Sequence, residues 1–140
     1  MGSPRYLLFE HTADLGIEVF GKDVRELMEN AVFALFDLLT DREAVRPETT
    51  WDVAAEGTSW DDLLVNLLRE VLYLANGREI LFREFSVVDL GEYRLAGRGT
   101  GERFDPRRHR MEMEIKAVTY HGLEVVPMES GWKGRVICDV

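Results

Sequence analysis

Hydrophobic residues recur with a helical period in an early stretch of the chain. Asp23, with Glu26 three positions later, predicts a capping box at the start of a helix. The apolar stripe that follows consists of Val24, Leu27, Met28, Ala31, Val32, Leu35, Leu38 and Leu39. Such a wide stripe is typical of a helix that packs against a core. We expect this helix to end near Thr40 and Asp41.

A second helical stretch follows Ser59, a residue that favours the N-cap position. Asp62 stands at the third position of this helix, where its charge suits the helix dipole. Leucine and valine dominate residues 63–74 and form another apolar face. The pair Asn76 and Gly77 favours a left-handed stop, so we expect the helix to end there.

Alternation of apolar and polar residues predicts strands over much of the remaining chain. In residues 15–20, every second side chain is apolar, which is typical of a half-buried strand. Further strands are expected over residues 6–9, 51–55, 80–90, 92–97, 111–119, 122–128 and 131–140. His121 and Gly122 predict a hairpin turn. Short turns favour antiparallel pairing. We therefore expect a single α+β domain over residues 1–140, with a mostly antiparallel sheet and two long helices packed on one face.

The composition indicates a folded acidic protein. Hydrophobic residues make up 46% of the chain, and 17 basic against 26 acidic residues give a formal net charge of −9. A chain with this charge is a poor generic binder of nucleic acid. Its one cysteine, Cys138, excludes an internal disulfide and is expected to be an inert buried thiol. We see no membrane-spanning stretch and no signal peptide, so we expect a cytoplasmic protein.

The first candidate site is the short connection between two predicted strands that contains His11 and Asp14. Such connections often carry functional groups on a rigid frame. Three positions apart, these residues can present a carboxylate oxygen with an imidazole nearby. The alternative is a turn in which Asp14 accepts hydrogen bonds from backbone amides, and the residue pattern alone favours that alternative.

The second candidate site is the end of the chain. Asp139 and the free carboxylate of Val140 place two anionic groups one residue apart, at the end of an apolar strand. Fixed carboxylates repel each other, and a hard divalent cation relieves that repulsion. A frayed, solvated tail is the alternative, and from the residues alone it is the more common outcome.

Two basic features are weaker candidates. Lys116 is expected on the strand face opposite Ile115 and Ala117, where it is either a counter-charge near an acidic site or a solvent-facing lysine. Residues 103–110 form the one basic cluster of the sequence. Arginine matches phosphate oxygens, but such a run is more often a solvated loop, and that is our expectation. We see no nucleotide-binding loop and no hydrolase motif.

Several of these segments together resemble the archease family. They are residues 11–14 with Gly16, the helical residues 31–40 and 63–74, the run KAVTYHGL at 116–123, and the ending VICDV at 136–140. The resemblance covers essentially the whole chain in the same order. Its most specific parts are KAVTYHGL and the final aspartate followed by a hydrophobic residue.

The resemblance implies a small α+β protein that assists the GTP-dependent RNA-splicing ligase, the enzyme that joins tRNA halves after intron removal. Archeases promote metal-dependent guanylylation of the ligase's active-site histidine, restore multiple turnover and broaden nucleotide use. The family's metal site maps onto Asp14, Asp139 and Val140, which makes metal binding there the preferred interpretation. His11 and Lys116 are candidate accessory residues.

The expected function is therefore that of a metal-binding accessory factor, not an enzyme, which meets RNA only through the ligase and binds no membrane. Oxygen ligands alone suit calcium, magnesium or manganese rather than zinc. Two other hypotheses stay open. One is a stand-alone metal-dependent phosphoesterase, in which Asp14 and Asp139 hold the ion and His11 acts as acid or base. The other is a chaperone-like binding module without metal chemistry.

Overall fold

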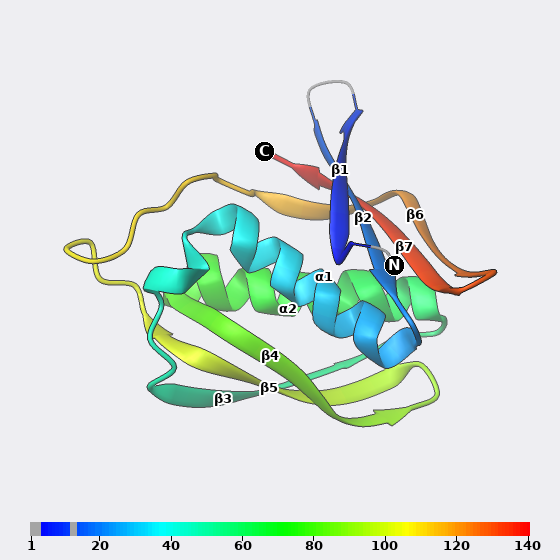
Figure 1. Ribbon diagram of the computed structural model, residues 1–140, viewed down its shortest axis with the longest axis horizontal. Coiled ribbons are helices and arrows are strands. Elements are labelled where there is room, and N and C mark those ends of the chain that lie inside the picture. The colour runs from blue at the N-terminus through cyan, green and yellow to red at the C-terminus, as the bar shows by residue number, and fades with distance from the viewer. Residues whose placement is uncertain (1–3, 12–13) are drawn as a thin grey trace.

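Two helices lie between two antiparallel sheets in the computed structural model, which describes residues 4–11 and 14–140 (Figure 1). The elements follow in the order β1 (Tyr6–His11), β2 (Asp14–Gly21), α1 (Val24–Leu39), the 3₁₀ helix η1 (Arg42–Ala44), β3 (Thr49–Glu56), α2 (Trp60–Arg78), β4 (Ile80–Gly91), β5 (Arg94–Arg103), β6 (Ala117–Met128) and β7 (Gly131–Asp139). The expected α+β class, with two helices and antiparallel strands, is confirmed.

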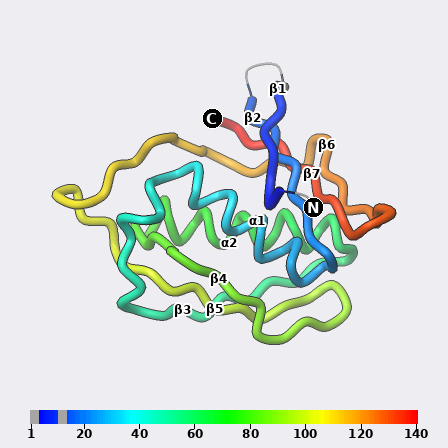
Figure 2. Tube along the Cα trace, in the orientation of Figure 1, coloured from blue at the N-terminus to red at the C-terminus, as the bar shows by residue number. Residues whose placement is uncertain are grey.

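The strands form two sheets, where we expected one sheet with both helices on one face. One sheet has the order β1-β2-β7-β6, and the other has the order β3-β5-β4. Each helix contacts both sheets, and the path of the chain in Figure 2 shows the helices as a middle layer. The reason is the width of their apolar surfaces. Ten of the 16 residues of α1 are buried, which is more than one sheet can cover.

The core fills the space on both sides of the helices. Its largest fully buried side chains include Phe36 and Leu27 from α1, Leu64 and Leu67 from α2, and Phe82 from β4. These side chains belong to one continuous apolar cluster that reaches both sheets. Among the described residues, no helix is long and apolar enough to cross a membrane.

Both helices begin where the sequence predicts. The side chain of Asp23 accepts a hydrogen bond from the backbone N–H of Glu26 at 2.8 Å, and the Glu26 side chain accepts one from the N–H of Lys22 at 3.0 Å. Ser59 accepts a hydrogen bond from the N–H of Asp62 at 3.0 Å. These bonds satisfy amide groups that the first turn of a helix leaves unpaired.

The end of α2 differs from the prediction. The helix continues through Asn76 and Gly77 to Arg78, and Glu79 is its C-cap, with a left-handed φ of 57°. A Cβ atom on Gly77 would lie 3.0 Å from Cε1 of Tyr73. Glycine is therefore suited to this position because the ring of Tyr73 occupies the space of a side chain, and it does not mark the end of the helix.

Strand β6 also differs from the prediction, because His121 and Gly122 form no hairpin turn. The strand runs from Ala117 to Met128, and its register against β7 shifts between Thr119 and Glu124. Gly122 lies in this irregular stretch with a φ of 65°. Since turns and bulges both favour a residue with positive φ, the sequence does not separate them. Residues 111–116, expected as part of a strand, precede β6.

Side chains of the two helices cover the outer edges of β4 and β6. Arg25 of α1 donates a hydrogen bond to the carbonyl of Val87, and Glu29 accepts one from the N–H of the same residue at 2.9 Å. Nε of Arg69 in α2 donates to the carbonyl of Val118 at 3.0 Å. Each of these strands is outermost in its sheet, so the bonds occupy backbone groups that would otherwise attract another strand.

Candidate functional site

The pairing of β2 with β7 brings the two candidate aspartates together. Leu15 pairs with Cys138 in this antiparallel ladder, and one further residue along each strand places Asp14 opposite Asp139. Residues at opposite positions share a face of the sheet, with Cβ atoms roughly 4.5–5.5 Å apart. Figure 1 shows the end of β7 beside the hairpin of β1 and β2. The connection around Asp14 and the end of the chain thus meet in space.

Both aspartates lie on the outer face of the four-stranded sheet. Cys138 is fully buried, and Leu15 packs against the same core from the neighbouring strand. Because side chains alternate along a strand, Asp14 and Asp139 belong to the opposite face. Asp139 is exposed and Asp14 is half-buried. Cys138 is the buried free thiol that we expected, and burial raises its pKa to about 12, which disfavours the reactive thiolate.

The other residues of the candidate site lie around this pair. His11 pairs with Asp14 across the hairpin, but its side chain lies outside the described part of the structure, as do Thr12 and Ala13. Val140 follows Asp139 and is exposed. Lys116 is exposed and lies just before β6, rather than on a strand face. Its N–H donates a hydrogen bond to the carbonyl of Asp139 at 2.7 Å, which helps to fix the end of the chain.

An apolar layer covers the strand next to the aspartates. Ile137 is on the same face as Asp139, yet only 1% of it is exposed. The ring of Phe9 lies over Gly16, the partner of Ile137 in the ladder, and the guanidinium of Arg135 stacks on that ring at 4.1 Å. This cover holds the backbone beside the aspartates in a fixed position. The sequence gives little sign of it, because Phe9 and Arg135 are far apart in the chain.

A metal ion needs several ligand atoms, so the number of ligating side chains at the candidate site is important. Among the described residues, no group of three or more His, Cys, Asp or Glu side chains is arranged to hold a metal ion. The candidate site offers two such side chains, Asp14 and Asp139. It therefore needs a further oxygen donor, and the carboxylate of Val140 is the group that the sequence suggests for this role. A set of three carboxylates fits a hard divalent cation.

A second polar cluster, which the sequence analysis missed, lies at the loop between β5 and β6. Glu102 is buried and accepts hydrogen bonds from the backbone N–H of Arg46 at 2.7 Å, from the guanidinium of Arg108, and from Nε2 of His109 at 2.8 Å. Nδ1 of His109 accepts a hydrogen bond from the N–H of Asp105, so Nε2 carries the ring proton.

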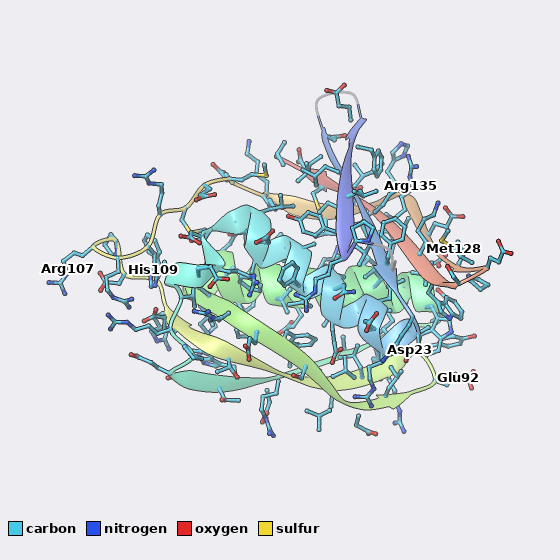
Figure 3. All side chains as sticks on the ribbon, viewed as in Figure 1. Asp23, Glu92, Arg107, His109, Met128 and Arg135 are labelled. Carbon is cyan, nitrogen blue, oxygen red and sulfur yellow. The ribbon has the colours of Figure 1, made fainter. Side chains whose placement is uncertain are left out.

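These bonds explain the acidity of Glu102. Burial by itself raises the pKa of this carboxyl group, but the hydrogen bonds from Arg108, Arg46 and His109 outweigh that effect and lower the pKa to about 2. The basic cluster at residues 103–110 is thus only in part the solvated loop that we expected. Figure 3 shows Arg107 at the tip of the loop and His109 where the loop meets the rest of the protein. The sequence pattern of residues 102–109 gives no signal of this contact, because the segment is not a helix and no period relates Glu102 to His109.

The fold and the site together define a class: a small α+β protein with two helices between antiparallel sheets and a pair of aspartates where the last strand ends. The sequence pattern of the Archease protein family matches residues 6–140. The chain therefore belongs to the archease family.

Individual relatives agree with this assignment. Protein archease of Methanosarcina mazei is 39% identical over 140 residues, covering 97% of this chain and 96% of its own. Protein archease of Pyrococcus furiosus is 34% identical over 136 residues, with 94% and 96% covered. The solution structure of Methanobacterium thermoautotrophicum protein 1598 superposes with a TM-score of 0.79 at 32% identity, covering 97% of this chain and 99% of the other.

Proposed function

We propose that this protein is a metal-binding accessory factor that activates the GTP-dependent tRNA-splicing RNA ligase. It promotes guanylylation of the active-site histidine of the ligase and supports multiple turnover. Membership of the archease family supports the choice of partner. The observation that carries the proposed metal site is the register of β2 and β7, which sets Asp14 beside Asp139. In this proposal the protein is not itself an enzyme, acts in the cytoplasm and meets RNA only through the ligase.

The proposed ligands are the side chains of Asp14 and Asp139 and the carboxylate of Val140. They suit calcium, magnesium or manganese, which prefer oxygen donors. Strand β7 is paired on both sides, with β2 and with β6, so Asp139 is held on a rigid frame. A frame that fixes several carboxylates close together favours a cation, because their mutual repulsion cannot be relieved by movement.

The chain's own residues would present this site to the ligase. A bound divalent cation supplies positive charge that neutralises phosphate oxygens during nucleotidyl transfer. Asp139 and Val140 are exposed at the end of the last strand, where another protein can reach them. Lys116, exposed beside them, is a candidate counter-charge for phosphate. The net charge of −9 favours encounter with a basic RNA-binding enzyme.

The direct test is a guanylylation assay of the ligase at fixed manganese, with and without this protein. We expect the guanylylated fraction and the number of turnovers to rise several-fold when the protein is added. No increase with a ligase that is otherwise active would contradict the proposal. Hydrolysis of generic phosphoesters by the isolated protein would instead support the phosphoesterase hypothesis. Activation without metal binding in a calorimetric titration would support the binding module.

A further inference from the structure

Two exposed aromatic side chains and one arginine share the region where α2 runs beside β6. Tyr73 of α2 and Tyr120 of β6 are 59% and 54% exposed, and they are the two aromatic residues among the large hydrophobic side chains exposed in the described structure. The guanidinium carbon of Arg69 lies 4.4 Å from the ring centroid of Tyr120, and Arg69 is one helical turn from Tyr73. We call the surface of these three residues the tyrosine face.

The tyrosine face is held in place without a partner. Nε of Arg69 donates to the carbonyl of Val118 at 3.0 Å, and the hydroxyl of Tyr120 donates to the carboxylate of Asp62 at 3.3 Å. The ring of Tyr73 lies against Gly77. The few residues that contribute most of the binding energy of protein interfaces are enriched in tyrosine and arginine, and groups fixed in advance lose less freedom on binding. Rigid, exposed side chains of these types therefore suit a protein partner.

The charge of the surroundings restricts the kind of partner. Asp61, Asp62 and Glu70 lie on the same stretch of α2 as Arg69, so carboxylates outnumber the cation there. A second copy of this chain would bring like charges together, and RNA would meet a predominantly anionic surface. A protein with a basic surface fits best.

The tyrosine face lies at the edge strand β6, next to the strand that ends in the candidate metal site. Val118, whose carbonyl is bound by Arg69, pairs with Cys138 in β7, directly before Asp139. A partner that covers Tyr120 and the β6 edge is therefore one strand away from the strand that ends at Asp139. We propose that the tyrosine face is the docking surface for the basic surface of the RNA ligase. This inference rests on the proposed function, and it adds a binding surface that is separate from the metal ligands.

The test compares binding with activation for the full chain. Binding to the ligase is measured by calorimetry for the wild type, Tyr73→Ala, Tyr120→Ala and the control Val88→Ala. Val88 is 56% exposed on β4, in the other sheet. We expect the Kd to rise about tenfold or more for each tyrosine variant and to stay unchanged for Val88→Ala. Guanylylation at saturating concentrations of either tyrosine variant should reach the wild-type level.

Further measurements distinguish a loss of docking from a loss of metal binding and from misfolding of a variant. Thermal melting checks each variant, and Tyr73→Ala, on an exposed helix position, tests the face even if Tyr120→Ala loosens β6. Asp139→Ala should show the opposite behaviour, with wild-type binding and no activation. If the wild type activates the ligase and both tyrosine variants bind as tightly as the wild type, the tyrosine face is not the docking surface. If the wild type itself does not bind the ligase, the proposed function fails and the docking proposal falls with it. Tight binding of tRNA alone that depends on the tyrosines would also overturn the proposal.

Discussion

Adjacent residues of the last strand have opposite environments, and this alternation sets their roles. Cys138 faces the core with its thiol protonated, whereas Asp139 is exposed on the outer face. The change from apolar Cys138 to charged Asp139 predicts this difference, although the apolar run 136–138 does not by itself show which face is buried. That Asp14 lies beside Asp139 could not be predicted from either segment alone, because it depends on which strands pair. The family resemblance, rather than periodicity, indicated that these positions belong together.

The buried carboxylate of Glu102 is expected to stabilise the folded protein through its charge and its hydrogen bonds. Its pKa in the folded protein is about 2, below the ordinary value of 4.5, so folding favours the ionised form. The stabilisation that the ionised carboxylate gives to the folded protein is complete above the ordinary pKa and is lost as the pH falls towards 2. We expect Glu102→Gln to lower the free energy of unfolding at neutral pH by about 1–3 kcal/mol.

Urea denaturation at several pH values measures both effects. The difference in stability between the wild type and Glu102→Gln should shrink as the pH is lowered from 5 towards 2. Glu114→Gln, at an exposed position of the same loop, should follow the wild type at every pH. A constant difference between the Glu102 variant and the wild type would show that the charge of Glu102 is not responsible.

At the level of the elements, local signals predict the start of both helices and the end of α1, which has Thr40 as its C-cap, but not the end of α2. Asp23 and Ser59 cap their helices as expected, since a cap depends on residues within one turn. The continuation of α2 past Gly77 depends on where the ring of Tyr73 lies. The bulge of β6 depends on its pairing with β7. Neither dependence is visible in a local pattern.

Side chains of α1 cover the outer edge of β4, and Glu29 makes one of these contacts. Glu29→Ala removes the acceptor for the N–H of Val87 and should lower the free energy of unfolding by about 1–3 kcal/mol. It should also promote association through the uncovered strand edge. Urea denaturation and light scattering measure these two effects, with Glu70→Ala as the control at an exposed helix position. Equal stability and solubility of the two variants would argue against a role for Glu29 at the edge.

For the whole molecule, the arrangement of two sheets around two helices was not predicted from the sequence. The apolar stripes indicate that both helices are buried, but they do not show how many layers bury them. The order of strands in each sheet joins segments far apart in the chain, such as β2 with β7. The composition alone gives the net charge of −9, and this negative charge favours a basic partner rather than RNA.

The middle layer should be the part of the molecule most sensitive to loss of volume. Leu67 of α2 is fully buried, and Leu67→Ala should lower the free energy of unfolding by about 2–5 kcal/mol. Asn66→Ala, at the neighbouring half-buried position, loses one hydrogen bond to the carbonyl of Glu56 and should cost less, about 0.5–1.5 kcal/mol. A melting curve that is unchanged by Leu67→Ala would contradict the assignment of α2 to the core.

The proposed function requires that the end of the last strand holds the metal through which the ligase is activated. It is tested most directly by guanylylation of the ligase histidine at fixed manganese, with the wild type, Asp139→Ala or Cys138→Ala in excess. Asp139→Ala should abolish activation while shifting the free energy of unfolding by only about 0.5 kcal/mol, because the side chain is exposed. Cys138→Ala should lower stability and activate normally per folded molecule. Full activation by Asp139→Ala, together with loss of activation by folded Cys138→Ala, would show that Asp139 is not a metal ligand and that the site lies on the other face of β7.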